Sequence, residues 1–169
     1  MGVIYELSGS KQKKYGYILV QTITTLFVLL FAYTATSKFL DYSLFVFQMR
    51  LAPLPMMILL APILGWLMPF IELIIAVSLL FGRFRLNALY ASVILLLIFD
   101  FYIVGMLLSH QHLPCTCGGI ISMMSWKQHL IFNGVFIAAG LSAILQLKNI
   151  NLIRLYLNRL QNHKNLSRA

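Results

Sequence analysis

The only two cysteines of this 169-residue chain, Cys115 and Cys117, lie one residue apart in residues 113–119. They are too close for one face of a regular helix, but in a turn their Cα atoms can approach within the roughly 4.4–6.8 Å that a disulfide tolerates. Pro114 restricts the entry to such a turn, and the two glycines after Cys117 permit positive φ and leave the sulfur atoms accessible. So small a ring is expected to be strained, and strain makes a disulfide easier to reduce. The stretch therefore predicts a dithiol with the chemistry of a thiol–disulfide oxidoreductase.

Two other interpretations of this cysteine pair stay open. His110 and His112 precede it, and two imidazoles with two thiolates form a ligand set suited to copper or zinc. Alternatively, Cys115 and Cys117 form a structural clip in a non-catalytic membrane subunit that anchors or assembles an envelope complex. Thiol exchange is favoured because the short spacing and the flanking glycines both suit an accessible, labile disulfide.

The rest of the chain is overwhelmingly apolar. Hydrophobic residues make up 60% of it and charged residues only 10%. A soluble protein of this length needs a far more polar surface, so most of the chain must be solvated by membrane lipid. The net charge of +9 comes without a basic stretch interleaved with aromatic residues, and nucleic acid is therefore not an expected partner.

Four apolar segments are long enough to cross a bilayer, which takes about 20 residues per helix. They predict an all-α integral membrane protein, a four-transmembrane-helix bundle with a short interfacial helix after the first span and a C-terminal amphipathic cytoplasmic helix. The expected spans are residues 16–36, 57–81, 86–108 and 129–147, in a membrane domain 1–147 that precedes a basic tail 148–169. The interfacial helix is expected at residues 39–51, before Pro53 and Pro55 break it.

Basic residues set the expected orientation. Ten of the 13 Lys and Arg residues lie in the N-terminal segment, in the 82–85 connection and in the tail. The positive-inside rule puts these parts and both termini in the cytoplasm, and puts the cysteine loop in the periplasm of a bacterial inner membrane, where disulfides persist. No cysteine lies within a span or on the cytoplasmic side. If the pair is redox-active, its electrons must therefore pass to a membrane quinone, to a periplasmic thioredoxin-like or disulfide-bearing protein, or to a subunit of a larger membrane complex.

Two of the four acidic residues, Glu72 and Asp100, lie inside predicted spans. A charge there is costly, so each is expected to face the bundle interior and to have a partner. Asp100 lies about 12 Å below the outer end of its span at 1.5 Å per residue, and Lys38 at the outer end of the first span is its expected counter-ion. Glu72 lies deeper, has no obvious basic partner and is expected to be protonated. A polar clamp between helices and a proton relay both stay open as roles for these acids.

Several stretches resemble the MauE branch of the DoxX-like membrane proteins. The main ones are residues 33–39 (YTATSKF), 114–119 (PCTCGG) and 126–133 (WKQHLIFN), with further likeness at 69–72 (PFIE), 83–85 (RFR) and 89–92 (LYAS). The likeness covers about residues 20–147, and the motifs occur in family order. The resemblance implies a four-span, redox-associated membrane protein. The named member of that family assists maturation of a disulfide-rich periplasmic dehydrogenase subunit.

The resemblance also implies roles for single residues. It makes Cys115 and Cys117 the catalytic redox pair. Its supporting positions are Lys38, Glu72, Trp126, His129 and Asn133. Asp100 lies outside the matching motifs, so its supporting role rests on its expected burial, and the lead-in with His110 and His112 is not a family feature.

Overall fold

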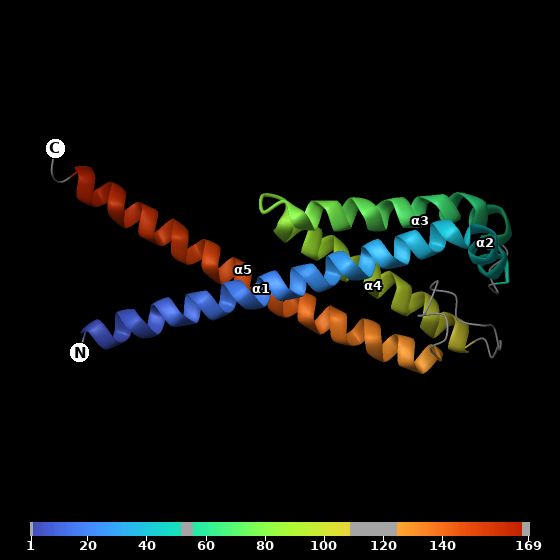
Figure 1. The fold of residues 1–169 in the computed structure, drawn as a ribbon, viewed down its shortest axis with the longest axis horizontal. Helices are drawn as coiled ribbons and strands as arrows, with labels where there is room; N and C mark the ends of the chain where they lie inside the picture. Colours follow the sequence, from blue (N-terminus) through green and yellow to red (C-terminus); the bar gives the residue numbers. More distant parts are fainter. Residues whose placement is uncertain (1, 52–55, 109–124, 167–169) are drawn as a thin grey trace.

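The computed structural model describes residues 2–51, 56–108 and 125–166, and every regular element in these ranges is an α-helix (Figure 1). The helices are α1 (Gly2–Leu40), α2 (Tyr42–Arg50), α3 (Met57–Leu80), α4 (Arg85–Leu108) and α5 (Trp126–Leu166). Four of them contain a segment long and apolar enough to cross a membrane, namely Tyr15–Leu40, Met57–Leu80, Arg85–Gly105 and Lys127–Ile150. The chain is therefore an all-helical, multi-pass membrane protein.

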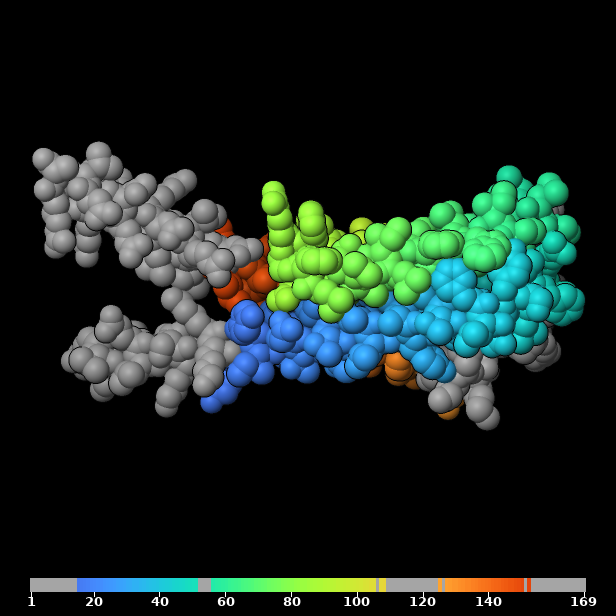
Figure 2. All heavy atoms as spheres, turned by 45° about the horizontal axis from the view of Figure 1, so that its top comes forward, coloured from blue at the N-terminus to red at the C-terminus, as the bar shows by residue number. Residues whose placement is uncertain are grey.

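The long helices form a bundle in which the most extensive contacts join α1 to α3 and α4 to α5. Figure 2 shows α1 and α3 side by side along one face of the molecule. The α3–α4 turn lies at the same end of the bundle as the first residues of α1 and the last residues of α5 (Figure 1). The end of α4 and the start of α5 consequently lie at the opposite end, which also holds α2. We call this opposite end the α2 end.

Two helices are longer than the spans predicted for them. α1 begins at Gly2, and α5 continues to Leu166 through the boundary expected at residue 148. The predicted tail is thus a continuation of the last membrane helix, because residues 148–166 contain no glycine or proline that would end it. Beyond the α3–α4 turn the outer parts of α1 and α5 diverge (Figure 1). The contact of the tail with a lipid leaflet stays a prediction.

Helix α2 follows α1 in the chain and packs against α3. The contact depends on Gly65, where a Cβ atom would lie 2.6 Å from Val46 Cγ2 and 2.9 Å from Tyr42 Cε2. Only glycine permits so close an approach. The Tyr42 hydroxyl also donates to the Pro62 carbonyl at 3.2 Å. A short helix is therefore present within the predicted residues 39–51, and its placement at the bilayer surface stays a prediction.

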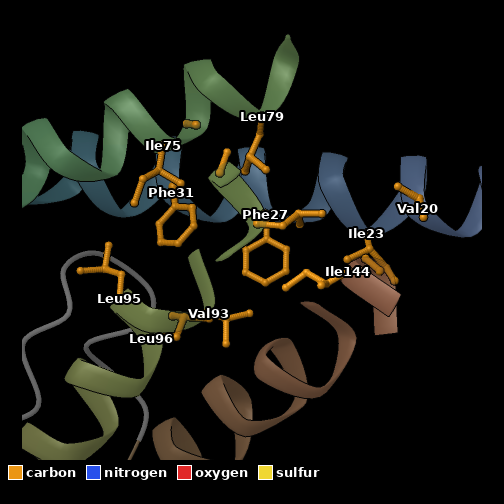
Figure 3. Packing of buried hydrophobic residues seen from close by; sticks show 14 residues of the cluster. Val20, Ile23, Phe27, Phe31, Ile75, Leu79, Val93, Leu95, Leu96 and Ile144 are labelled. Atoms are coloured by element: carbon orange, nitrogen blue, oxygen red, sulfur yellow. The ribbon is translucent and has the colours of Figure 1, made fainter. Parts of the chain in front are cut away.

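The centre of the bundle is built on Phe27 of α1, which is fully buried. Its ring packs edge-on against Phe136 of α5 with the centroids 5.4 Å apart, and lies 5.9 Å from the ring of Phe31. Figure 3 shows Phe27 between Leu79 of α3 and Ile144 of α5. A single large side chain thus fills the space where these helices meet, and it fixes the distances between them.

Candidate functional site

A capping box fixes the start of α5. The Ser125 backbone N–H donates to Gln128 Oε1 at 2.9 Å, and the Gln128 backbone N–H donates to Ser125 Oγ at 3.4 Å. A helix that begins here carries His129 in its first turns and Asn133 one turn later on the same face. Both side chains are polar and yet buried, with 4% and 3% of their surface exposed. α5 therefore directs two polar groups into the bundle at the α2 end.

A buried ion pair joins α1 to α3. Lys38, in the last turn of α1, donates from Nζ to Glu72 Oε1, and both side chains are almost completely buried. Side chains on a helix lean toward its N-terminus, so Lys38 reaches back into the bundle and Glu72 reaches toward the start of α3. Because α1 and α3 run in opposite directions, the two side chains lean toward each other.

This geometry corrects the predicted pairing of the buried charges. Lys38 pairs with Glu72 rather than with Asp100, so the expectation that Glu72 lacks a basic partner is wrong. On α4, the residue that approaches Lys38 is Phe99, whose ring centroid lies 5.2 Å from Nζ. Asp100 follows it in the helix, about 100° further round, and bonds to α5 instead.

Asp100 is held by an amide from α5. Asn133 Nδ2 donates to Asp100 Oδ1 at 2.8 Å. The contact ties α4 to α5, as the ion pair ties α1 to α3. The half-buried acid of α4 is thus held by a neutral donor, and within the described ranges the ion pair of the bundle is that of Lys38 and Glu72.

Replacing Asn133 with alanine is expected to lower the free energy of unfolding by about 1–3 kcal/mol, because Asp100 then loses a buried donor. Thermal unfolding of the purified protein in detergent measures the loss. Asp100→Asn is the matched variant, since it keeps an oxygen that accepts from Asn133, and a smaller effect is expected. An Asn133→Ala protein as stable as the wild type would show that the contact contributes nothing.

A cavity of about 20 Å³ lies beside the ion pair, and we call it the polar cavity. Its polar lining consists of Thr34, Lys38, Glu72, His129 and Asn133, and its apolar walls are Leu30, Phe31, Leu96, Phe99 and Phe132. All four long helices contribute to it. Four of the predicted supporting residues are thus gathered around one space from distant parts of the sequence.

Thr34 belongs to this site although it was not among the predicted residues. Its hydroxyl lies 3.2 Å from Glu72 Oε2 and 3.3 Å from the Phe31 carbonyl oxygen, so it can donate to either. The sequence signal was present, because Thr34 precedes Lys38 by four residues and therefore lies on the same face of the helix.

The predicted dithiol lies outside the described residues. Cys115 and Cys117 fall in the segment between α4 and α5 that the structure does not describe, as do His110 and His112. Trp126 begins α5, and its side chain is also outside the description. Within the described ranges, no group of three or more His, Cys, Asp or Glu side chains could hold a metal ion. The redox and metal-binding roles given to these residues stay predictions.

The membrane domain matches one known protein family. The family model described as methylamine utilisation protein MauE matches residues 17–146. No curated protein and no solved structure matches the chain. The matched stretch includes every residue that lines the polar cavity, and it confirms the resemblance seen in the sequence motifs. This chain belongs to the MauE family.

Proposed function

We propose that this MauE-family protein is a membrane-bound thiol–disulfide redox protein that presents Cys115 and Cys117 to a periplasmic partner. The observation that carries the proposal is the position of the polar cavity. The segment with both cysteines is attached to Leu108 at the end of α4 and to Ser125 before α5. His129, which lines the cavity, lies one turn from the second attachment point. Groups able to bind and transfer protons are thereby gathered at the end of the bundle from which the dithiol segment emerges.

The proposed reaction passes two electrons from the partner to the cysteine pair. A partner thiolate attacks Cys117 Sγ of the oxidised pair, which forms a mixed disulfide and releases Cys115 as a thiolate. A second partner thiolate attacks the partner's own sulfur in the mixed disulfide, so the partner leaves oxidised and the pair is left reduced. The reduced pair must then give up two electrons and two protons to re-form its disulfide, and a membrane quinone, which would become a quinol, is the class of acceptor that we propose. Cys117 is the favoured sulfur because the glycines after it leave it open.

The partner is expected to be a thioredoxin-like or disulfide-bearing protein of the periplasm. The family description, methylamine utilisation, extends this expectation to a disulfide-rich envelope protein used in that metabolism. Such a protein needs its cysteines oxidised after export, which the two-electron step supplies.

Single-cysteine variants test the exchange reaction. In Cys115→Ser, the Cys117 thiolate can attack the disulfide of the oxidised partner, which is the reverse of the proposed step and releases one partner thiolate. The pair then has no second cysteine to break the mixed disulfide, so a reductant-sensitive adduct with the partner is expected to accumulate. The double variant Cys115→Ser/Cys117→Ser is the matched control and should form none. Non-reducing electrophoresis and mass spectrometry of the purified protein identify the adduct. If neither single variant captures a partner and the wild-type disulfide resists glutathione, the cysteines are a structural clip.

A second test concerns the proposed location in a bacterial inner membrane with the dithiol in the periplasm. A membrane-impermeant thiol reagent is expected to label the reduced pair in intact spheroplasts. The control is Gly82→Cys in the double-serine background, because Gly82 is exposed in the α3–α4 turn with nothing within 4 Å of an added Cβ. This cysteine should be labelled only after the membrane is permeabilised. The reverse pattern would overturn the orientation.

A further inference from the structure

Lys38 and the Thr34 hydroxyl contact the Glu72 carboxylate, and each of them has a second stabilising neighbour within reach. We propose that Glu72 accepts and releases a proton inside the bundle, through one water molecule bound in the polar cavity. The alternative is a fixed clamp, in which Glu72 stays ionised as long as the protein is folded. The proposal deepens the proposed function, and its physiological role rests on that function, but its test does not.

The polar cavity has the size and the lining that a bound water requires. Its volume of about 20 Å³ exceeds the roughly 10–15 Å³ that one water needs. Buried waters make about two to four hydrogen bonds, and polar side chains of Thr34, His129 and Asn133 line the cavity beside the ion pair. A water here connects Glu72 on α3 to His129 on α5.

When Glu72 is neutral, two aromatic rings remain beside the Lys38 ammonium group and stabilise its charge. Its ammonium group lies 5.2 Å from the ring centroid of Phe99 and 5.7 Å from that of Phe45. The face of an aromatic ring attracts a cation, and the attraction strengthens where water is excluded. A lysine near two ring faces therefore tolerates the loss of its counter-ion better than one surrounded by aliphatic groups.

Thr34 likewise has an alternative acceptor. When Glu72 is ionised, the Thr34 hydroxyl can donate to Oε2 at 3.2 Å. When Glu72 carries a proton, the same hydroxyl can rotate to the Phe31 carbonyl oxygen at 3.3 Å and leave Oε2 free for other contacts. Protonation of Glu72 thus leaves neither the Lys38 ammonium group nor the Thr34 hydroxyl without a stabilising contact.

The other ionisable groups around Glu72 suggest the route of the proton. In the described part of the chain they are Lys38 from α1, His129 from α5 and, behind Asn133, Asp100 from α4. α2 contributes no group to the lining of the cavity. His129 is the member nearest in sequence to the dithiol segment, and imidazole is the side chain best suited to pass a proton near neutral pH. The route therefore runs from the α2 end through His129 and the water to Glu72.

This route supplies a proton store for thiol exchange. The attacking thiol of the partner must lose a proton, and the Cys115 thiolate released from the broken S–S bond must gain one. The proton moves from the partner thiol to Glu72 and then to Cys115. The transfer moves one proton and no electrons, consumes no further reactant, and leaves Glu72 as it began.

Infrared spectroscopy of the full-length protein in lipid vesicles tests the proposal. The chain contains two glutamates, Glu6 and Glu72, so Glu6→Gln protein made by cell-free synthesis with carboxyl-labelled glutamate carries the label on one carboxyl group. On acidification, the labelled carboxylate band should give way to a labelled carboxylic-acid band while the helical amide band stays unchanged. A carboxylate band that persists until the helices unfold would falsify the proposal.

The role of Lys38 is tested by removing one ring. Phe99→Leu keeps an apolar side chain and removes a ring face from the ammonium group. The ammonium group lies near Phe99 also while it pairs with Glu72, so Phe99→Leu removes only the extra attraction gained when Glu72 is neutral. The ratio of protonated to ionised Glu72 at a given pH is therefore expected to fall, by at most about thirtyfold. Phe132→Leu is the matched control, since Phe132 also lines the cavity and the rings over Lys38 Nζ are those of Phe45 and Phe99. Equal ratios in the two variants would overturn this part of the proposal.

The same titration in Cys115→Ser/Cys117→Ser protein separates the two proposals. Glu72 should titrate there as in the parent protein, because the site belongs to the bundle. If Glu72 titrates and no partner is captured, the proposal of a proton site is retained and the proposal of thiol exchange is rejected. If a partner is captured and Glu72 stays ionised in the folded protein, the proposal of thiol exchange is retained and the proposal of a proton site is rejected.

Discussion

Replacing Lys38 with methionine is expected to lower the free energy of unfolding by about 3–5 kcal/mol at neutral pH. Methionine preserves the length of the side chain but removes the ammonium group, and the Glu72 side chain is only 1% exposed. The Glu72 carboxylate then stays buried with the Thr34 hydroxyl as a donor too weak to replace a cation. The loss should shrink as the pH falls, because a proton can then neutralise the carboxylate that the lysine no longer balances.

The matched variant removes both charges. Lys38→Met/Glu72→Met is expected to regain most of the lost stability, because apolar side chains of similar volume then replace the whole ion pair. Lys127→Met controls for the loss of an exposed lysine. Reversible unfolding in mixed micelles, followed by circular dichroism at neutral and acidic pH, measures all four proteins. A Lys38→Met protein as stable as the wild type at neutral pH would contradict the prediction.

Placing leucine at Gly140 is expected to destabilise the protein by about 1–3 kcal/mol or more. A Cβ atom there would lie 2.7 Å from Val93 Cγ2 and 3.1 Å from Phe27 Cζ, and both neighbours are buried in the core. The substituted residue lies on α5 and its neighbours lie on α4 and α1, so three helices must move to make room. The melting temperature in detergent is the measurement.

Gly134→Leu on the same helix is the matched control. A Cβ atom at Gly134 meets nothing within 4 Å, and the residue is exposed on the bundle surface. Both substitutions gain roughly 1 kcal/mol in helix propensity, so the difference between the two variants reports the overpacking alone. Equal melting temperatures would mean that α5 does not pack as closely on Phe27 and Val93 as the structure has it.

The membrane helices could be predicted because each is an uninterrupted apolar run of the length that a bilayer demands. The second span, expected at residues 57–81, is α3 at Met57–Leu80. Hydropathy predicts the lipid-solvated part of a helix and not the whole helix. α5 therefore extends past residue 148, since the polar continuation contains nothing that breaks a helix.

The partners of the charged side chains within the spans could not be predicted from the sequence, because hydropathy indicates depth but not which helices are neighbours. Depth alone made Asp100 the natural partner of Lys38. The packing of α1 on α3 and of α4 on α5 assigns Lys38 to Glu72 and Asp100 to Asn133 instead. The direction in which helical side chains lean favours the same assignment of Lys38 and Glu72.

Some residues of the site could nevertheless be predicted from the sequence. The resemblance to MauE proteins singled out His129 and Asn133, and the structure brings both to the polar cavity. The Ser125-x-x-Gln128 pattern could have located the start of α5, because this spacing is that of a capping box. Thr34 could have been added from its four-residue spacing to Lys38.

At the α2 end, the bundle consists of two halves, α1 with α3 and α4 with α5, and one polar contact joins the two helices of each half. The ion pair of Lys38 and Glu72 lies within the half made by α1 and α3, and the bond from Asn133 to Asp100 lies within the half made by α4 and α5. The polar cavity is lined by both halves and so lies on the seam between them. Neither of these two polar contacts crosses the seam. Access to Glu72 therefore depends on the apolar side chains that wall the cavity, and a change in their size alters that access without breaking either contact.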